Sequence, residues 1–364
     1  MNQLLRRAFC WKSAFYGLFL PLLSRLGPAR CDAVLSALGK ALIWLQPGAK
    51  ARLRQALGRA KEVLDLDGPV EDLWPALAGG TMRILARDYP LDCRDDREAL
   101  DRFDVVGAAQ LQSDLAAGRG VILVGSHLGA YIEGLHWLYR KGLPVRALVQ
   151  RPWHVSRLLT RRFDDATGPH PQSRMFLKRD LTRPQAVELL QRARAALRDG
   201  LAVYLCGDIP WMGPNTRPGR LLGVEHRFLS IWIELAVLTR APVYHVFCTH
   251  QKGGRYRLDL QTVDRIDDGE QGQAVAEYLR QLEARIATSP AQAVAHLLWP
   301  CYSPARGQLA TASAGPHRPV HVRPSRRATP AQVAATRPSL AEIRPSLNVS
   351  RPLPARKDVA LPGR

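Results

Sequence analysis

The chain has 364 residues, of which 46% are hydrophobic and 23% are charged, and its formal net charge is +20 at pH 7. This length and apolar content allow one large or two ordinary domains and exclude a chain that is disordered throughout. The positive charge predicts an anionic partner: nucleic acid, an anionic membrane surface or an acidic protein. The six cysteines are dispersed without a Cys-x-x-Cys spacing, which indicates a reduced, cytosol-facing protein without zinc.

The N-terminus starts with Arg6 and Arg7 and continues with an apolar stretch. Its uncharged run, residues 13–24, is shorter than the roughly 20 residues of a spanning helix. It also lacks the uninterrupted apolar region and cleavage site of a secretory signal. We therefore predict a first domain, residues 1–48, that is a membrane-associated segment lying at or partly in the interface, with an ordinary core helix as the alternative. The side chains expected at headgroup depth are Phe9, Trp11, Phe15, Tyr16 and Phe19.

A second domain is expected over residues 49–302. Apolar residues at helical spacing predict helices over 29–45, 50–66 and 73–89, followed by a short strand at 103–106. The helix over 50–66 carries basic residues on its outer face, which fits contact with anionic lipid or a merely solvated surface.

The most informative stretch is Val121 to Glu133. Four apolar residues, Val121 to Val124, predict a strand buried on both faces, which Gly125 and Ser126 end. His127 follows, and the next apolar residues have a helical period with Glu133 in the first turns. A histidine at the carboxyl end of a central strand lies where open α/β sheets bind ligands. We interpret His127 and Glu133 as a base and its orienting acid, against the alternative of a structural histidine.

Helices and strands then alternate, which is typical of an α/β fold with a mostly parallel central sheet flanked by helices. Two strand ends carry polar residues: Arg151 follows one strand, and Asp208 follows another. A long irregular loop is expected between Ile209 and Gly223. The remaining expected elements are strands at 144–150, 201–205, 242–248 and 256–260, the last two antiparallel, and helices at 182–199, 230–239 and 275–286.

The segment Gly125-Ser126-His127-Leu128-Gly129-Ala130-Tyr131-Ile132-Glu133 resembles the His-(four residues)-acid signature of the bacterial lipid A late acyltransferases, the lauroyl and myristoyl transferases, within the lysophospholipid acyltransferase-like superfamily. Here five residues separate His127 from Glu133, which turns the acid by about 100° on a regular helix unless a bulge or a longer loop compensates. The resemblance covers roughly residues 1–300. It includes Val149-Gln150-Arg151-Pro152, the segment from Gly200 to Asp208, and the segment from Ala236 to Val243.

The resemblance implies an O-acyltransferase on the cytoplasmic face of the cell inner membrane. His127 would act as general base and Glu133 would orient it, with backbone N–H groups near Gly125 or the helix start stabilising the oxyanion. The acyl donor would be a thioester of acyl carrier protein or coenzyme A, serving as a co-substrate. The acceptor would be a hydroxyl of a lipid A precursor or related glycolipid. No cofactor or metal is expected.

Four further residues are substrate-binding candidates. Arg151 suits a bidentate phosphate contact, or is a surface arginine. Arg162, favoured over Arg161, lies about where the family carries an arginine important for activity. Asp208 matches a family aspartate that would hydrogen-bond an active-site group or the acceptor, or is a turn residue. Gly223 corresponds to a glycine that adjoins the acyl donor.

Two rival functions share these features: a glycerolipid acyltransferase, and a non-catalytic membrane-binding homologue. The second is favoured by the extra residue before Glu133 and by the mere trace, at 297–300, of the family's Trp-rich end. Residues 303–364 are rich in Pro, Ala, Ser and Arg and are expected to be disordered. This tail carries much of the basic excess but no aromatic platform, so no specific nucleic-acid recognition is expected.

Overall fold

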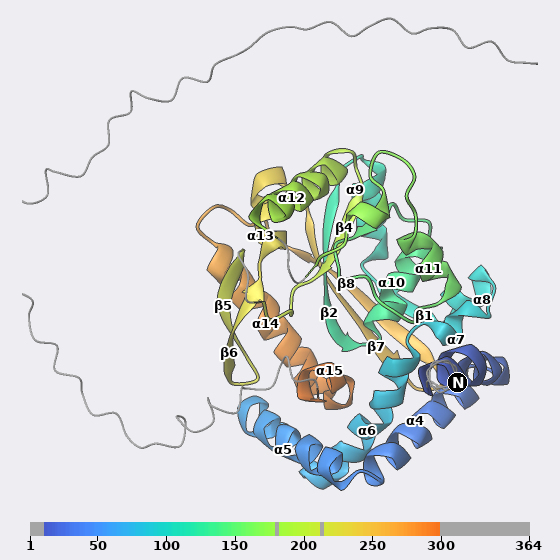
Figure 1. Ribbon diagram of the computed structural model, residues 1–364. Coiled ribbons are helices and arrows are strands. Elements are labelled where there is room, and N and C mark those ends of the chain that lie inside the picture. The colour runs from blue at the N-terminus through green and yellow to red at the C-terminus, as the bar shows by residue number, and fades with distance from the viewer. Residues whose placement is uncertain (1–10, 179–181, 212–214, 299–364) are drawn as a thin grey trace, which may run out of the picture. The chain divides into compact units, whose positions relative to one another are not determined.

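A six-stranded sheet forms the centre of the computed structural model, which describes residues 11–178, 182–211 and 215–298 (Figure 1). The strand order is β1-β8-β7-β2-β4-β3. Strands β7, β2, β4 and β3 run parallel, and β8 returns antiparallel to β7 and pairs with β1. The predicted mostly parallel sheet is confirmed. Its strands are β1 (Phe103–Val106), β2 (Val121–Gly129), β3 (Val145–Ala147), β4 (Ala202–Cys206), β7 (Val243–Gln251) and β8 (Arg255–Val263).

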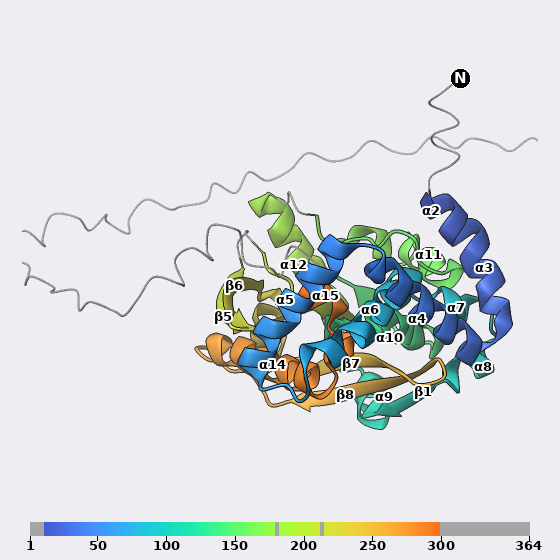
Figure 2. The same cartoon turned by 90° about the horizontal axis from the view of Figure 1, so that it is seen from below.

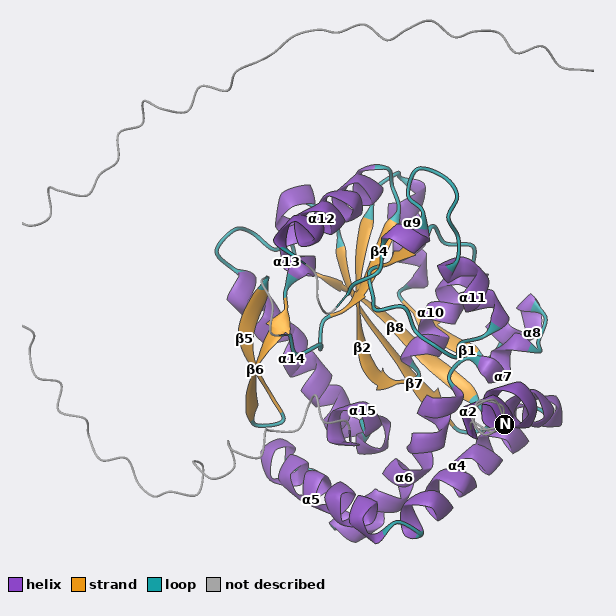
Figure 3. Ribbon diagram, viewed as in Figure 1, coloured by secondary structure: helices purple, strands orange, loops and turns teal. Residues whose placement is uncertain are grey.

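Helices flank both faces of this sheet (Figure 3). The alternation of side chains along β2 shows why: Ile122 and Val124 belong to one apolar core, whereas Val121 and Leu123 belong to the other. The first core is shared with α4 (Pro28–Trp44), α5 (Pro47–Leu64), α6 (Val70–Ala86), α12 (Arg183–Arg198), α13 (Ile231–Thr239), α14 (Gln271–Thr288) and α15 (Val294–Leu298). The second is shared with α7 (Tyr89–Asp92), α8 (Asp96–Leu100), α9 (Ala108–Ala116), α10 (Tyr131–Arg140) and α11 (Arg157–Phe163).

The N-terminal segment is helical in four short pieces and has two different faces. Its pieces are α2 (Trp11–Ala14), the π-helical η1 (Phe15–Phe19), α3 (Leu20–Leu23) and the 3₁₀ turn η2 (Ser24–Leu26). Phe15, Tyr16, Leu20 and Leu23 are buried in a small core with residues of α4 and α6, and Figure 2 shows α2 and α3 at the right-hand side of the described part. Phe15 and Tyr16 were expected at headgroup depth, so this part of the prediction is wrong. The opposite face exposes Trp11, Leu18, Leu22 and Leu26.

None of the helices in the described part of the chain is long and apolar enough to cross a bilayer. Phe9 and the whole of the segment 303–364 lie outside the described residues.

The predicted irregular loop from Ile209 to Gly223 is wrong over its second half. Strands β5 (Thr216–Leu221) and β6 (Val224–Leu229) form an antiparallel hairpin. Its turn residues, Leu222 and Gly223, both have positive φ angles of 51° and 77°, as a two-residue hairpin turn with the strand twist requires. Pro218 and Gly219 suggested a loop, but a two-stranded ribbon consists only of edge strands, where proline is tolerated.

Candidate active site

His127 lies in an irregular part of β2. The pairing with β7 runs from Gly125 opposite Val246 to Gly129 opposite Cys248, so β2 advances four residues while β7 advances two. Such a bulge bends a strand and redirects its side chains. His127 is the one residue of β2 that is not buried, with 20% of its side chain exposed. A compensating irregularity before the helix was foreseen, but it turns the imidazole toward a different acid from the one expected.

Asp208 is the carboxylate that holds His127. Its Oδ1 lies 2.9 Å from the imidazole Nδ1, and its Oδ2 accepts a 2.6 Å hydrogen bond from the His127 backbone N–H. The same Oδ2 lies 2.8 Å from Nε2 of His296 on α15. Asp208 is fully buried. The placement follows from strand pairing, because Gly125 is opposite Cys206 and both His127 and Asp208 come two residues later.

These contacts keep the Asp208 carboxylate ionised. Burial raises the pKa of Asp208, but the charge and hydrogen bond of His127 and the hydrogen bond from His296 outweigh burial, so that the pKa lies well below its usual range. An ionised carboxylate can only accept hydrogen bonds, so whenever the His127 ring is neutral its one proton is on Nδ1. The basic nitrogen of that ring is then Nε2, which is the arrangement that a general base needs.

Backbone groups around Gly125 are already occupied. The Gly125 carbonyl accepts hydrogen bonds from the Tyr278 hydroxyl at 2.6 Å and from the Gly207 N–H at 2.9 Å. The N–H of His127 donates to Asp208, and that of Leu128 donates to the Ser126 hydroxyl. The N–H groups of His127 and Leu128 are therefore not available to an oxyanion, whereas the first N–H groups of α10, which begins at Tyr131, have no intrahelical acceptor.

Cys206 completes a cluster of possible metal ligands with His127 and Asp208, whose ligand atoms all lie within 4.8 Å of one another. Burial and the neighbouring Asp208 charge raise the pKa of the Cys206 thiol far above its usual value. Such a thiol is protonated and is a poor nucleophile, which argues against an acyl-enzyme at Cys206. Hydrogen bonds hold His127 and Asp208 in this geometry.

Glu133 does not orient His127 in the structure. No hydrogen bond or ion pair joins these two described side chains, and Glu133 instead lies near His250, whose Nε2 is 3.9 Å from its Oε1. The strand continues to Gly129 and α10 begins only at Tyr131, so Glu133 faces the N-terminal helices instead. Burial raises the pKa of Glu133 to about 8, only partly offset by its own backbone N–H. The predicted pairing is therefore wrong, and Asp208 takes that place.

Arg151 lies in the segment that follows β3. The guanidinium of Arg151 pairs with Asp164 and lies 5.9 Å from the centroid of the Trp153 ring. Trp153 belongs to the same segment. Because β3 lies beside β4 and parallel to it, this segment begins at the same edge of the sheet as Asp208, which follows β4. A cavity of about 220 Å³ there is lined by Arg151, Trp153, Tyr89, His154 and Thr160, among others.

Arg162 and Gly223 have contacts that do not themselves reveal a ligand. Arg162, in the last turn of α11, lies 6.0 Å from the ring centroid of Tyr139. Gly223 is in the turn of the β5–β6 hairpin, where an added Cβ would approach Val63 of α5 to 2.8 Å. A glycine is favoured at position 223 because the φ angle there is positive and because the backbone packs closely against Val63.

Two features escaped the sequence analysis. His296 was not noticed as a site residue, although it immediately precedes the 297–300 trace of the family's terminal motif. A second histidine–aspartate pair, His136 and Asp88, is completely buried, with 2.8 Å between Nδ1 and Oδ2. There the Arg140 Nε–H donates to Nε2 of His136. The Arg140 contact occupies the second ring nitrogen of His136, so this pair has a structural role.

The fold and the site together define an α/β protein with a carboxylate-oriented imidazole at the carboxyl edge of parallel strands, suited to deprotonating a hydroxyl. The chain matches the family of bacterial lipid A biosynthesis acyltransferases over residues 81–295, more than half of its length, and it belongs to that family. It is therefore an acyltransferase. The matched region contains both His127 and Asp208. A comparison with curated proteins gave no match.

Proposed function

We propose that the protein transfers a fatty acyl chain from a thioester to a hydroxyl of a lipid A precursor or related glycolipid, with His127 as general base and Asp208 as its positioning residue. The observation that carries the proposal is the pair of hydrogen bonds from His127 to the buried, ionised Asp208. The donor is a thioester of acyl carrier protein or of coenzyme A, and an acidic carrier would suit the net charge of +20.

In the proposed reaction, Nε2 of His127 takes the proton of the acceptor hydroxyl as its oxygen attacks the thioester carbonyl. The resulting oxyanion is stabilised at the N-terminal end of α10, where the helix dipole is positive. When the tetrahedral intermediate collapses, the carbon–sulfur bond breaks and the thiolate takes the proton back from the imidazolium. The ionised Asp208 stabilises that imidazolium while it lasts. The cycle leaves an ester and a free thiol.

The acceptor headgroup is proposed to occupy the cavity beside Arg151 and Trp153. An arginine suits a phosphate and an exposed indole suits a sugar ring, and Trp153 is 72% exposed. Arg162 on the neighbouring α11 would add positive charge for the same group. Gly223 remains a candidate on the donor side, since the hairpin that contains it follows Asp208 in the chain.

The enzyme is proposed to work on the cytoplasmic face of the cell inner membrane. Support comes from the N-terminal helices, whose outer face exposes large apolar side chains although none of the described helices can span a bilayer. Exposed apolar residues on a short amphipathic segment are typical of interfacial binding. On the short segment 11–26 the exposed apolar residues are Trp11, Leu18, Leu22 and Leu26, and Trp44 and Leu45 at the end of α4 are exposed as well.

The test is a screen of acceptors with the purified full-length protein in detergent. Acyl carrier protein or coenzyme A thioesters are supplied with a lipid A precursor, a simpler glycolipid or a lysophospholipid, and the products are analysed by mass spectrometry. We expect the glycolipids to gain one acyl group. Acylation of the lysophospholipid alone would instead indicate a glycerolipid acyltransferase. Binding to anionic vesicles without turnover on any acceptor would indicate a non-catalytic homologue.

A further inference from the structure

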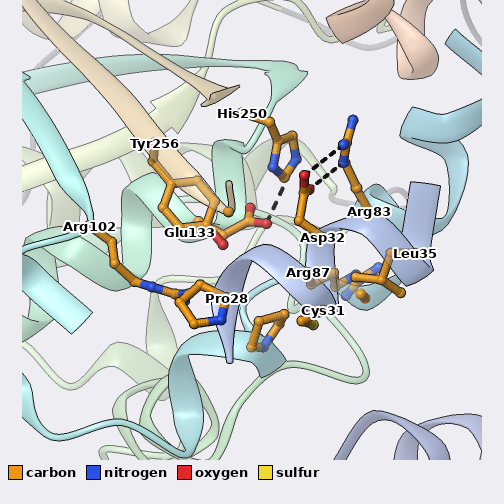
Figure 4. Close-up of a pocket in the computed structure, with 13 residues that line it drawn as sticks. Pro28, Cys31, Asp32, Leu35, Arg83, Arg87, Arg102, Glu133, His250 and Tyr256 are labelled. Carbon is orange, nitrogen blue, oxygen red and sulfur yellow. Dashed lines mark hydrogen bonds and ion pairs between the residues drawn. The ribbon is translucent and has the colours of Figure 1, made fainter. Parts of the chain in front are cut away.

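A second cavity, lined by several charged side chains, lies beside the first turn of α10. It is lined by the beginning of α4, the end of α6, the residue before β1, the end of β7 and the beginning of β8 (Figure 4). Its volume is about 20 Å³, which exceeds the roughly 10–15 Å³ that one buried water needs but is too small for an acyl chain. The lining includes Asp32, Arg83, Arg87, Arg102, Glu133 and His250.

Arg102 is the unusual member of this lining. Its side chain is only 5% exposed, yet its Nε and Nη2 have no hydrogen-bond partner among the described residues. These two N–H groups form the edge of a guanidinium that binds the two oxygens of a carboxylate or phosphate. A buried donor without an acceptor costs free energy, and a buried charge without a partner costs more. The pattern indicates a missing acceptor.

The charges around the cavity favour an anion as that acceptor. Arg83 is neutralised by Asp32 through hydrogen bonds of 2.6 and 2.9 Å. Burial raises the pKa of Glu133 to about 8, and burial together with Arg83 lowers the pKa of His250 to about 3, so both are mainly neutral at pH 7.

The 3.9 Å contact between Glu133 and His250 is thus not an ion pair, and it is too long for a hydrogen bond. Arg87, which donates to the Trp153 carbonyl, and Arg102 remain as the cations of the lining without a carboxylate partner there.

We propose that this cavity binds a single small oxyanion, a phosphate or carboxylate group, through the Nε–Nη2 edge of Arg102. The neutral carboxyl of Glu133 and the orphaned Nε2 of His250 line the same space and can donate to oxygens that Arg102 does not reach (Figure 4). Bound there, the anion would join the residue before β1, the end of β7 and the first turn of α10, and so stabilise the packing of α10 against the sheet. The proposal is independent of the acyl transfer proposed above.

The experiment measures the thermal unfolding temperature of the full chain while inorganic phosphate or acetate is titrated at constant ionic strength. Arg102→Met removes the charge at similar volume, and Arg97→Gln, at an exposed arginine of α8, is the matched control. We expect a saturable rise of about 3–6 °C in the parent protein and in Arg97→Gln, and none in Arg102→Met. Without anion, Arg102→Met should be at least as stable as the parent, because it removes an unpaired buried charge.

A rise of equal size in Arg102→Met, or a rise that does not saturate, would show a general salt effect and overturn the proposal. So would the absence of any rise. If Arg102→Met does not fold, Arg102→Lys replaces it. This variant should bind phosphate at least tenfold more weakly in calorimetry, because an ammonium lacks the two parallel N–H donors of a guanidinium. Vesicles of phosphatidylcholine with and without phosphatidic acid then distinguish a lipid headgroup from free phosphate as the source.

Discussion

Replacing Asp208 with asparagine is expected to lower kcat by about 10³–10⁴-fold, an effect of the size seen when an orienting aspartate is amidated in a serine-protease triad. Asp208 accepts from His127 Nδ1, from the His127 N–H and from His296, and an asparagine offers only one oxygen to these donors. The His127 tautomer and its imidazolium would both lose their support. The measurement is the initial rate of thiol release from an acyl thioester with saturating acceptor.

Glu133→Gln is the informative comparison, because the sequence pattern assigns the orienting role to that residue. The structure predicts that this variant keeps at least a hundredfold more activity than Asp208→Asn. Circular dichroism of both variants establishes that each is folded. If Glu133→Gln is the more severely impaired of the two, the His127–Asp208 pair is not the catalytic arrangement.

Glu133→Gln is also expected to change how stability depends on pH. Burial raises the pKa of Glu133 to about 8, whereas the unfolded chain releases this proton near the ordinary value of 4.5. Between these values the unfolded state binds fewer protons, so the free energy of unfolding falls as the pH rises from 4.5 to 8. Glutamine has no proton to lose. The variant should match the parent near pH 4 and be more stable by about 3–5 kcal/mol at pH 9.

Urea unfolding at pH 4, 7 and 9, in buffers without phosphate or acetate, measures this difference. Glu62→Gln, at an exposed position of α5, serves as the control and should follow the parent at all three values. Asp208 contributes in the opposite sense: its lowered pKa adds stability above about pH 4 that is lost as the pH falls further. A Glu133→Gln variant that is less stable than the parent at pH 9 would mean that the ionised carboxylate is well solvated or paired.

Periodicity in the sequence was sufficient for most elements of the fold. The apolar spacing predicted α4, α5, α6, α12 and α14 with shifts of only a few residues, and the apolar runs predicted the strands of the central sheet. In α12 the local signal was strong because Thr182 and Gln185 form a capping box. Both strands of the hairpin at 216–229 were missed, and over β5 the reason is that proline and glycine are also the commonest loop residues.

The site was predicted only in part, because it depends on which strands are neighbours. His127 and Asp208 were both recognised at strand ends, but they are 81 residues apart, and nothing local indicates that β4 lies beside β2 in register. Glu133 was the natural partner from spacing alone. The two-residue excess of β2 over β7 after Gly125, which is a tertiary feature, decides that His127 faces Asp208.

The most direct test of the account is the transfer rate of a His127→Ala variant beside the parent protein, measured as acceptor-dependent release of free thiol in detergent. The proposed base predicts that the rate falls at least a thousandfold while vesicle binding and the unfolding temperature stay close to those of the parent. A variant that releases thiol and acylates the acceptor at the parent rate would contradict the role of His127.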